Sequence, residues 1–423
     1  MAIIGQVVIF IIVAFGIVGA IAAIRDDEHG MGAEWKEGLH SIGPIFIPVA
    51  GIMASIPYLS RFVEAVVGPL FNLVGASPAM AATSVIAVDM GGYQLAHAIA
   101  DNTASWIMAA IVGYMAGATI VFSIPVGLAM LDRRDHKYMA LGIMSGILTV
   151  PVGVLITTSI LTLTGTNLRD EISTSTASTY SLAVLGFSQI IVNLIPLIIF
   201  VVAIALGLYF YPNIMITGFM WFGRFMDAAI KIILALSIAE YFTGIFTTVF
   251  GAWGFDPIIA DAQDQFRALE IAGYIGITLS GAFPMVYVIR TYLARPLGAI
   301  GRRFGLSSEG SAGVVAASAN ILALYHMIKV IPPKDKVLCI AFAVCSAFLL
   351  GDHLAFTANF QPNMILPLII GKFTAGILAI ALAVWIAVPT ALRLEEQDRD
   401  EGIIGDDEYT EQVGTPRADE PAG

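Results

Sequence analysis

The sequence predicts an all-α membrane protein, a polytopic bundle of transmembrane helices with an internal structural repeat and interrupted helices. Hydrophobic residues make up 58% of the chain and charged residues 13%, and the mean hydropathy is +0.85. Many apolar runs exceed the roughly 20 residues that a helix needs to cross the hydrocarbon core of a bilayer. A transmembrane strand would alternate apolar and polar residues, whereas residues 190–208 are almost continuously apolar. We therefore expect a multi-pass protein of the cell membrane, embedded in the lipid bilayer.

The apolar runs predict about 10–11 spans within one transmembrane domain, residues 1–390. The first run has no basic segment before it and is about twice as long as the apolar part of a signal peptide, so we expect it to be a retained span. Basic residues between 329 and 336 break the regular alternation of cytoplasmic and external loops, which predicts a broken or re-entrant span nearby. The predicted spans are 3–24, 41–59, 78–98, 103–131, 138–163, 179–209, 214–250, 268–293, 309–328, 336–359 and 363–390.

The negative charge of the chain is concentrated at its C-terminal end. The formal net charge is −11, and residues 391–423 contain eleven acidic and three basic residues. This composition predicts an acidic, solvated and disordered tail. The basic residues lie in short loops and form no extended stripe, so we expect no nucleic-acid partner. A homo-oligomer is compatible with the sequence but is not required by it.

Motifs of enzymes and metal sites are not found in the sequence. It contains no phosphate-binding glycine loop with lysine, no His-Glu-x-x-His helix and no nucleophile elbow. The six histidines are scattered, and Cys339 and Cys345 stand within one predicted span, where small packing residues are expected. We therefore predict neither an enzyme nor a bound cofactor or metal ion.

Two stretches of the chain, near 41–131 and 268–362, resemble each other and predict an internal repeat. Repeats of this kind let many carriers build a site near the middle of the membrane from two interrupted helices. Chance similarity between two Gly- and Ala-rich segments is the alternative. Counting the predicted crossings gives both units the same orientation, although inverted units are usual in carriers. The matched positions are Gly75 with Gly305, Asp89 with Asn320, Asp101 with Asp335, Gly117 with Gly351, and Ala118-Thr119 with Asp352-His353.

Asp89 is the strongest candidate for a functional residue. A carboxylate at membrane depth costs at least a few kcal/mol, so it tends to face a cavity, a partner or a substrate path. Gly91 and Gly92 allow the helix to break there, and Tyr93 and Gln94 follow directly. A carboxylate beside an aromatic face suits a small organic cation, whereas a hard metal ion would require several more oxygen ligands.

A second apolar run contains Gly351, Asp352 and His353. This acid and imidazole could bind a substrate hydroxyl or relay a proton, although an Asp that caps a helix or pairs with a neighbouring His is the alternative. Asn193 and Asn320 are weaker candidates, because amides often hold membrane helices together. Thr119 and Ser123 are weaker still, since hydroxyls in such helices commonly bond their own backbone.

These residues belong to segments that resemble the EutH family of ethanolamine-utilisation permeases. The resemblance extends from about residue 40 to about residue 390, and its most specific segments are 89–92, 117–126, 138–151, 193–196 and 351–354. Two departures are mild: the family's usual proline after Gly117 is Ala118, and its usual glycine after Leu354 is Ala355. The resemblance does not extend to the acidic tail.

The resemblance implies uptake of ethanolamine, a small and mostly protonated amine with one hydroxyl, across the cell membrane. In that case Asp89 binds the ammonium group, Tyr93 and Gln94 shape the pocket, and Asp352 with His353 assists binding or carries a proton. Two alternatives stay open from the sequence. One is a proton- or sodium-coupled carrier of another small solute, and the other is a membrane scaffold or receptor that docks a soluble partner through its acidic tail.

Overall fold

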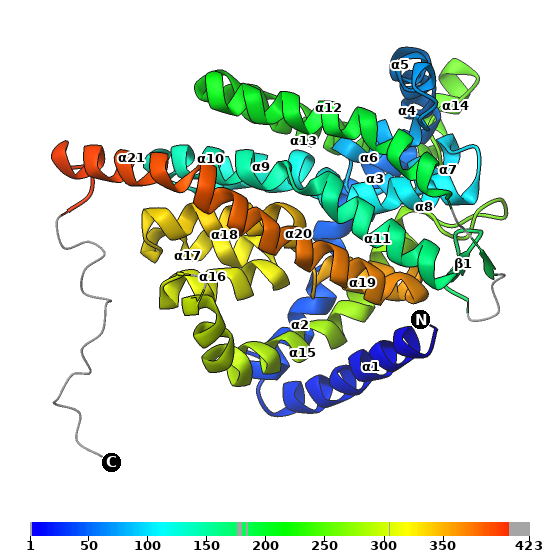
Figure 1. Ribbon diagram of the computed structural model, residues 1–423. Coiled ribbons are helices and arrows are strands. Elements are labelled where there is room, and N and C mark those ends of the chain that lie inside the picture. Colours follow the sequence, from blue (N-terminus) through cyan, green and yellow to red (C-terminus); the bar gives the residue numbers. More distant parts are fainter. Residues whose placement is uncertain (1, 176–179, 183–184, 304, 406–423) are drawn as a thin grey trace.

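The computed structural model describes residues 2–175, 180–182, 185–303 and 305–405, and helices dominate it (Figure 1). The last part of the predicted tail, residues 406–423, lies outside the described residues. A small antiparallel pair of strands, β1 (Asn167–Arg169) and β2 (Tyr180–Leu182), was not expected from the sequence. The α-helices are α1 (Ala2–Arg25), α2 (Gly30–His40), α3 (Ile42–Ala54), α4 (Ile56–Phe62), α5 (Gly68–Leu73), α6 (Ala79–Val85), α7 (Gly92–Ile99), α8 (Thr103–Val112), α9 (Ile124–Met130), α10 (His136–Ile147), α11 (Val150–Thr164), α12 (Phe187–Phe210), α13 (Pro212–Thr243), α14 (Ile245–Phe250), α15 (Ala268–Arg303), α16 (Ser308–Ala319), α17 (Ile321–Met327), α18 (Pro333–Ser346), α19 (Asp352–Phe360), α20 (Ile365–Ile386) and α21 (Val388–Asp400).

Several of these helices are joined by short π or 3₁₀ segments. Within the described residues these are the π-helices η1 (Val63–Val67) and η3 (Gly113–Ser123), and the 3₁₀ turns η2 (Val88–Met90), η4 (Arg133–Asp135), η5 (Ile328–Val330) and η6 (Pro362–Met364). Helices α8, η3 and α9 therefore run on as one element from residue 103 to residue 130. The π segment matters because π bulges interrupt the regular hydrogen bonding of a helix and occur frequently at functional sites.

Seven helices in the described part of the chain are long and apolar enough to cross a membrane, fewer than the predicted spans. The protein is accordingly a multi-pass, all-α membrane protein. Three of the predicted spans are broken, and a fourth, 214–250, corresponds to the long helix α13, which is not among the seven. Predicted span 78–98 is divided between α6 and α7, span 309–328 between α16 and α17, and span 336–359 between α18 and α19. The predicted interruptions are therefore present.

The element from α8 to α9 and the element from α18 to α19 cross each other in opposite directions. Going along the first element, Tyr114 contacts Thr357 (2.8 Å between the hydroxyls), and Thr119 donates to the Val344 carbonyl at 2.8 Å. Just beyond α9, Asp135 accepts a hydrogen bond from Lys336 at 2.7 Å. As the residue number increases along the first element, the residue number of its contact partner decreases, from 357 through 344 to 336. The two elements are therefore antiparallel.

This orientation differs from the one given by the count of predicted crossings. The count treated residues 309–328 as one complete span. In the structure, Asn320 is extended, and the short helices α16 and α17 on its two sides pack against each other. If residues 309–328 are counted as a segment that turns back rather than as a crossing, the count gives the two units opposite orientations.

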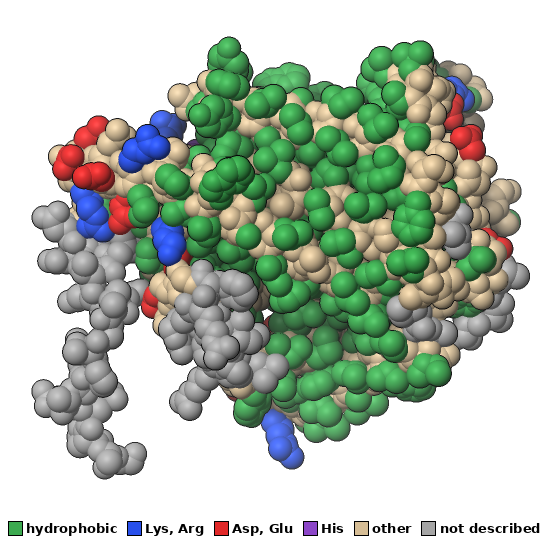
Figure 2. Space-filling view, in the orientation of Figure 1, with side chains coloured by type: hydrophobic (Ala, Val, Ile, Leu, Met, Phe, Trp, Pro, Cys, Tyr) green, Lys and Arg blue, Asp and Glu red, His purple; other side chains and the backbone are tan. Residues whose placement is uncertain are grey.

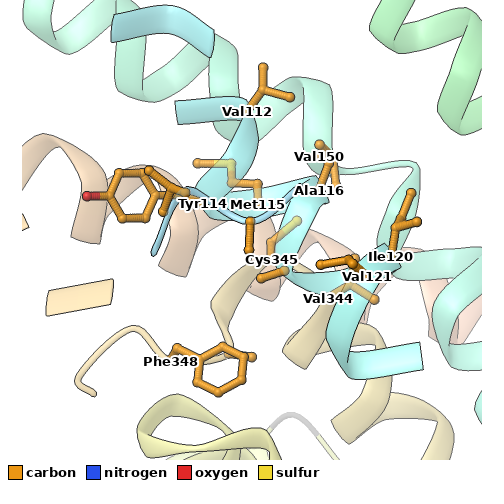
Figure 3. Close-up of a cluster of buried hydrophobic side chains, with 14 of the residues drawn as sticks. Val112, Tyr114, Met115, Ala116, Ile120, Val121, Val150, Val344, Cys345 and Phe348 are labelled. Atoms are coloured by element: carbon orange, nitrogen blue, oxygen red, sulfur yellow. The ribbon is translucent and has the colours of Figure 1, made fainter. Parts of the chain in front are cut away.

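The crossing elements form the centre of the molecule. In the span Thr103–Met130, 94% of the most apolar window is buried, against 11% for α1, which therefore lies at the periphery. Val344 and Cys345 of α18 pack beside residues of η3, including Ala116 and Val121 (Figure 3). Apolar side chains cover the middle of the face shown in Figure 2, while charged side chains gather towards its ends, as expected for a protein surrounded by lipid.

The C-terminal helix α21 corrects the predicted start of the disordered tail. Residues 391–400, assigned to the tail from their composition, are helical. Asp398 is buried, accepts a hydrogen bond from the Tyr138 hydroxyl at 2.8 Å and forms an ion pair with Lys137. An acidic segment can thus be ordered where a basic partner in another helix compensates its charge.

Candidate functional site

A cavity of about 360 Å³ lies where the interrupted helices meet α2, α3 and α15. Asp89, Asn320 and Asp352, which are far apart in the sequence, all line it. Its aromatic walls are Phe122, Phe283, Tyr287 and Phe348, and its charged lining also includes Glu34, Glu37 and Arg290. Arg290 and Glu34 form an ion pair at 3.2 Å, with 52% and 30% of their side chains exposed, so they mark the open end of the cavity.

The break between α6 and α7 positions Asp89. Ile86 and Ala87 are extended, η2 follows, and Gly91 has a φ of +93°, which favours glycine. A Cβ atom on Gly91 would lie 2.9 Å from Ile52, and one on Gly92 would lie 2.5 Å from the Ala87 carbonyl oxygen. These predicted site residues therefore shape the backbone that presents Asp89, and nothing larger fits at either position.

The break between α18 and α19 positions Asp352. Phe348 has a φ of +60°, which is rare for a residue with a bulky side chain. The Leu350 N–H donates to the Ser318 carbonyl at 2.8 Å, and a Cβ atom on Gly351 would lie 2.3 Å from the Ala319 carbonyl oxygen. The break is thus held against the end of α16, and Asp352 begins α19 at the cavity wall.

Asn320 lines the cavity at the break between α16 and α17. Its side-chain oxygen accepts a hydrogen bond from the Leu322 N–H at 2.8 Å and so caps α17. The amide nitrogen of the same side chain remains a donor for a ligand. Asn320 is therefore a helix cap at the edge of the cavity, and its contact with a ligand stays a prediction.

His353 lies directly behind the cavity, between Asp89 and a lysine. Its Nε2 is 3.8 Å from Asp89 Oδ1, and its Nδ1 is 2.9 Å from Lys372 Nζ. Lys372 also donates to the Tyr114 carbonyl at 2.6 Å, and both Lys372 and His353 are buried. These contacts connect a buried cation to the cavity through an imidazole ring.

The structure corrects the prediction that Tyr93 and Gln94 shape the pocket. Helix α7 begins at Gly92 and leaves the cavity, so neither side chain lines it. The Tyr93 hydroxyl accepts a hydrogen bond from Gln361 at 2.9 Å, and its ring packs 4.7 Å from that of Trp106. Gln94 is buried, and its side-chain amide has no hydrogen-bond partner among the described residues. The aromatic lining comes from the four residues named above instead.

Three weaker candidates also lie outside the cavity lining. Thr119 donates to Val344, as described above, and Ser123 donates to the Ala118 carbonyl at 3.2 Å. Asn193 accepts a hydrogen bond from the Ser77 N–H at 2.9 Å and so connects α12 to the turn before α6. Each contact fits the packing interpretation that the sequence left open. Ala118, next to Thr119, does line the cavity.

Lys372 was missed in the sequence although its signal was visible. It is the one charged residue in the apolar stretch 363–390, and burial of a lysine in a membrane helix points to function. The aromatic residues of the cavity had no such signal, because phenylalanine is ordinary in apolar spans. Among the described residues, no group of three or more potential metal-binding side chains comes together.

A multi-pass helical protein whose broken helices bring acidic residues into one cavity has the features of a membrane transporter. The model of the family described as "Ethanolamine utilisation protein, EutH" matches residues 4–386. The chain belongs to this family.

The relatives found by comparison are similar over nearly their whole length. A Listeria monocytogenes protein named "Probable ethanolamine permease EutH" is 36% identical over 387 residues, 91% of this chain and 94% of the relative. An Escherichia coli protein of the same name is 35% identical over 367 residues, 84% of this chain and 86% of the relative. A Bacillus subtilis protein named "Uncharacterized protein YxeR" is 32% identical and covers 90% of this chain and 95% of its own length. No solved structure matches this chain.

Proposed function

We propose that this protein is a permease that takes up ethanolamine across the cell membrane. The observation that carries this proposal is the convergence of Asp89, Asp352 and Asn320 on one cavity inside a helical membrane protein. The names of the Listeria monocytogenes and Escherichia coli relatives support the choice of substrate. Ethanolamine matches the chemistry of the cavity, because it is a small cation with one hydroxyl group.

Asp89 binds the ammonium group in this proposal. Its side chain is 15% exposed, so it is largely withdrawn from water while still open to the cavity. A charge pair is stronger in such a site than in water, because the effective dielectric constant is lower. The rings of Phe122 and Phe348, whose centroids are 5.9 Å apart, offer faces for cation–π contacts, worth about 0.5–2 kcal/mol each.

Asp352 and Asn320 bind the hydroxyl group. A carboxylate at Asp352 accepts a hydrogen bond from the hydroxyl, and the free amide nitrogen of Asn320 donates one to its oxygen. Neither group duplicates the role of Asp89, so the substrate has one preferred orientation. Glu34 and Glu37 at the open end add negative charge, which attracts cations towards the cavity.

We also propose that the two interrupted units are an inverted repeat. A Cβ atom on Gly117 would lie 2.3 Å from the Ile86 carbonyl oxygen, and one on Gly351 would lie 2.3 Å from the Ala319 carbonyl oxygen. Gly75 and Gly305, which precede α6 and α16, have φ values of +73° and +76°. The antiparallel course of the two long elements supports inversion, the arrangement from which carriers obtain alternating access to a central site.

Uptake by the purified protein in lipid vesicles tests the substrate and the site together. Labelled ethanolamine should accumulate in vesicles with the wild-type protein, and Asp89→Asn should reduce uptake to the level of empty vesicles. Asp227→Asn is the matched control, because Asp227 is 61% exposed on α13, away from the cavity. Normal uptake by Asp89→Asn would remove Asp89 from the mechanism, and no uptake by the wild type would contradict the proposed substrate.

Repeating the assay with and without imposed pH and sodium gradients tests whether transport is coupled to an ion. Competition by other amines in the same vesicles tests whether a different small solute is preferred.

A further inference from the structure

The buried Lys372 is the most unusual charged residue of the structure outside the proposed binding contacts. It lies in α20, and its side chain is 1% exposed. None of the described carboxylates is within ion-pair distance of its ammonium group. An ammonium group at such a position costs several kcal/mol unless another charge compensates it. Its location therefore requires an explanation from the surrounding groups.

The contacts of Lys372 lead to the cavity. Its Nζ donates to the Tyr114 carbonyl at 2.6 Å and lies 2.9 Å from His353 Nδ1. Because an ammonium group can only donate, Nδ1 is the acceptor and the ring proton of a neutral imidazole is on Nε2. That nitrogen has no hydrogen-bond partner among the described residues and is 3.8 Å from Asp89 Oδ1. His353 therefore lies between Lys372 and Asp89 and contacts both.

A count of charges gives this arrangement a function. Asp89 and Asp352 line the cavity and contribute two negative charges when both are ionised, and Lys372 contributes one positive charge behind it when it is protonated. With His353 neutral, the side chains of Asp89, Asp352, His353 and Lys372 have a net charge of −1. The other charged lining residues lie at the open end, where Glu34 is paired with Arg290 and Glu37 is exposed. One singly charged ammonium ion brings the net charge of the four side chains to zero, whereas a doubly charged ion leaves an uncompensated positive charge in a low-dielectric site.

We propose that Lys372 is a specificity-determining residue: it cancels one of the two negative charges of Asp89 and Asp352 and so restricts the carrier to singly charged amines. His353 separates Lys372 from the cavity. The ammonium group of Lys372 can therefore balance a carboxylate charge without occupying the substrate-binding position. This inference rests on the proposed function of the same cavity as an amine-binding site. It adds the rule by which the cavity selects the charge of its substrate.

Competition between singly and doubly charged amines tests the proposal. Labelled ethanolamine uptake by the full-length protein in vesicles is measured with unlabelled ethanolamine and with unlabelled 1,3-diaminopropane, which is slightly longer and doubly charged at neutral pH. The wild type should be inhibited better by ethanolamine. In Lys372→Met the inhibition by the diamine, relative to ethanolamine, should improve by at least about tenfold, the effect of one modest charge interaction.

Two further variants distinguish charge from packing. Lys372→Gln removes the charge but keeps a group that can donate to Tyr114, and it should show the same shift as Lys372→Met. The double variant Lys372→Met with Asp352→Asn restores the net charge of −1, so its preference should return to within about threefold of the wild-type ratio. Lys231→Met, on the exposed face of α13, is the control.

The outcomes separate this inference from the proposed function. If wild-type protein takes up ethanolamine but both Lys372 variants keep the wild-type ratio, the inference is wrong and the proposed function stands. A shift that the Asp352→Asn change fails to reverse also overturns the inference, because it points to altered packing. Removal of a buried charge from an apolar helix favours membrane insertion, so we expect the Lys372 variants to fold.

Discussion

The two interrupted units of the proposed repeat have similar backbone arrangements and different side chains. In each unit the first helix of a short pair, α6 or α16, ends against a glycine of the following long element, Gly117 or Gly351. The long element of the first unit continues through the π-helix η3, whereas that of the second unit breaks completely between α18 and α19. The contacts of the two matched glycines are therefore more similar between the units than the types of helix around them.

The charges follow a different pattern from the backbone. The first helix-pair break carries the carboxylate of Asp89, and the matching break carries the amide of Asn320. At the second matched position, Ala118 and Thr119 of the first unit correspond in sequence to Asp352 and His353 of the second. Similar scaffolds thus deliver unlike groups to one cavity. In the proposed inverted repeat, the matched backbones would provide the movement of a carrier and the unequal side chains would provide the recognition.

The sharpest way to break this comparison is to exchange the groups at the two breaks. In the variant Asp89→Asn with Asn320→Asp, ethanolamine uptake should stay below about 1% of the wild type, because the loss of a buried charge partner costs about 3–5 kcal/mol and the new carboxylate is not placed opposite His353. Vesicle uptake measures this. The variant Asp227→Asn controls for effects of expression and reconstitution on uptake. Uptake above half of the wild-type level in the exchanged variant would show that the two breaks are equivalent.

Replacing the paired glycines tests whether the framework is shared. Gly117→Ala and Gly351→Ala each place a Cβ atom 2.3 Å from a backbone carbonyl oxygen, so the backbone must shift. We expect both to destabilise the purified protein by about 2–3 kcal/mol, as for overpacked positions in other interiors. Thermal unfolding in detergent measures the loss. Gly218→Ala, where an added Cβ meets nothing within 4 Å, is the control, and a large effect at only one of the paired glycines would argue against the repeat.

Asp352→Asn tests the unequal roles of the two carboxylates. The amide keeps a hydrogen-bonding group at the cavity but loses the charge, so ethanolamine should bind about tenfold more weakly, much less than the loss expected at Asp89. The concentration dependence of uptake measures this change. A loss as severe as that of Asp89→Asn would show that the ammonium group is shared by both acids.

Tyr93→Phe tests the smallest expected effect. The variant removes the hydroxyl that accepts a hydrogen bond from Gln361 but leaves the ring packed against Trp106. We expect a loss of about 1 kcal/mol in stability and no change in the affinity for ethanolamine. Thermal unfolding and the concentration dependence of uptake measure the two quantities. A change of affinity would return Tyr93 to the binding site, as the sequence alone suggested.

Particular residues show how far the sequence could predict the site. Asp89 and Asp352 stood out because charged residues in apolar spans are rare, and Gly91, Gly92 and Gly351 stood out because glycines beside them allow a helix to break. Lys372 carried the same kind of signal and was overlooked. Phe122 and Phe348 could not be selected, since they differ in no way from other aromatic residues of the spans until the fold turns them towards the cavity.

The sequence by itself determined that this chain is a helical membrane protein of the EutH family, where its helices are interrupted, and which acids are costly enough to suggest function. Those properties depend on local composition and spacing. Only the tertiary structure decided that the two long elements run in opposite directions, that Tyr93 points away from the cavity, and that His353 connects Lys372 to Asp89. The reason is physical: a contact between residues hundreds of positions apart depends on how broken helices fold back, which no local pattern records.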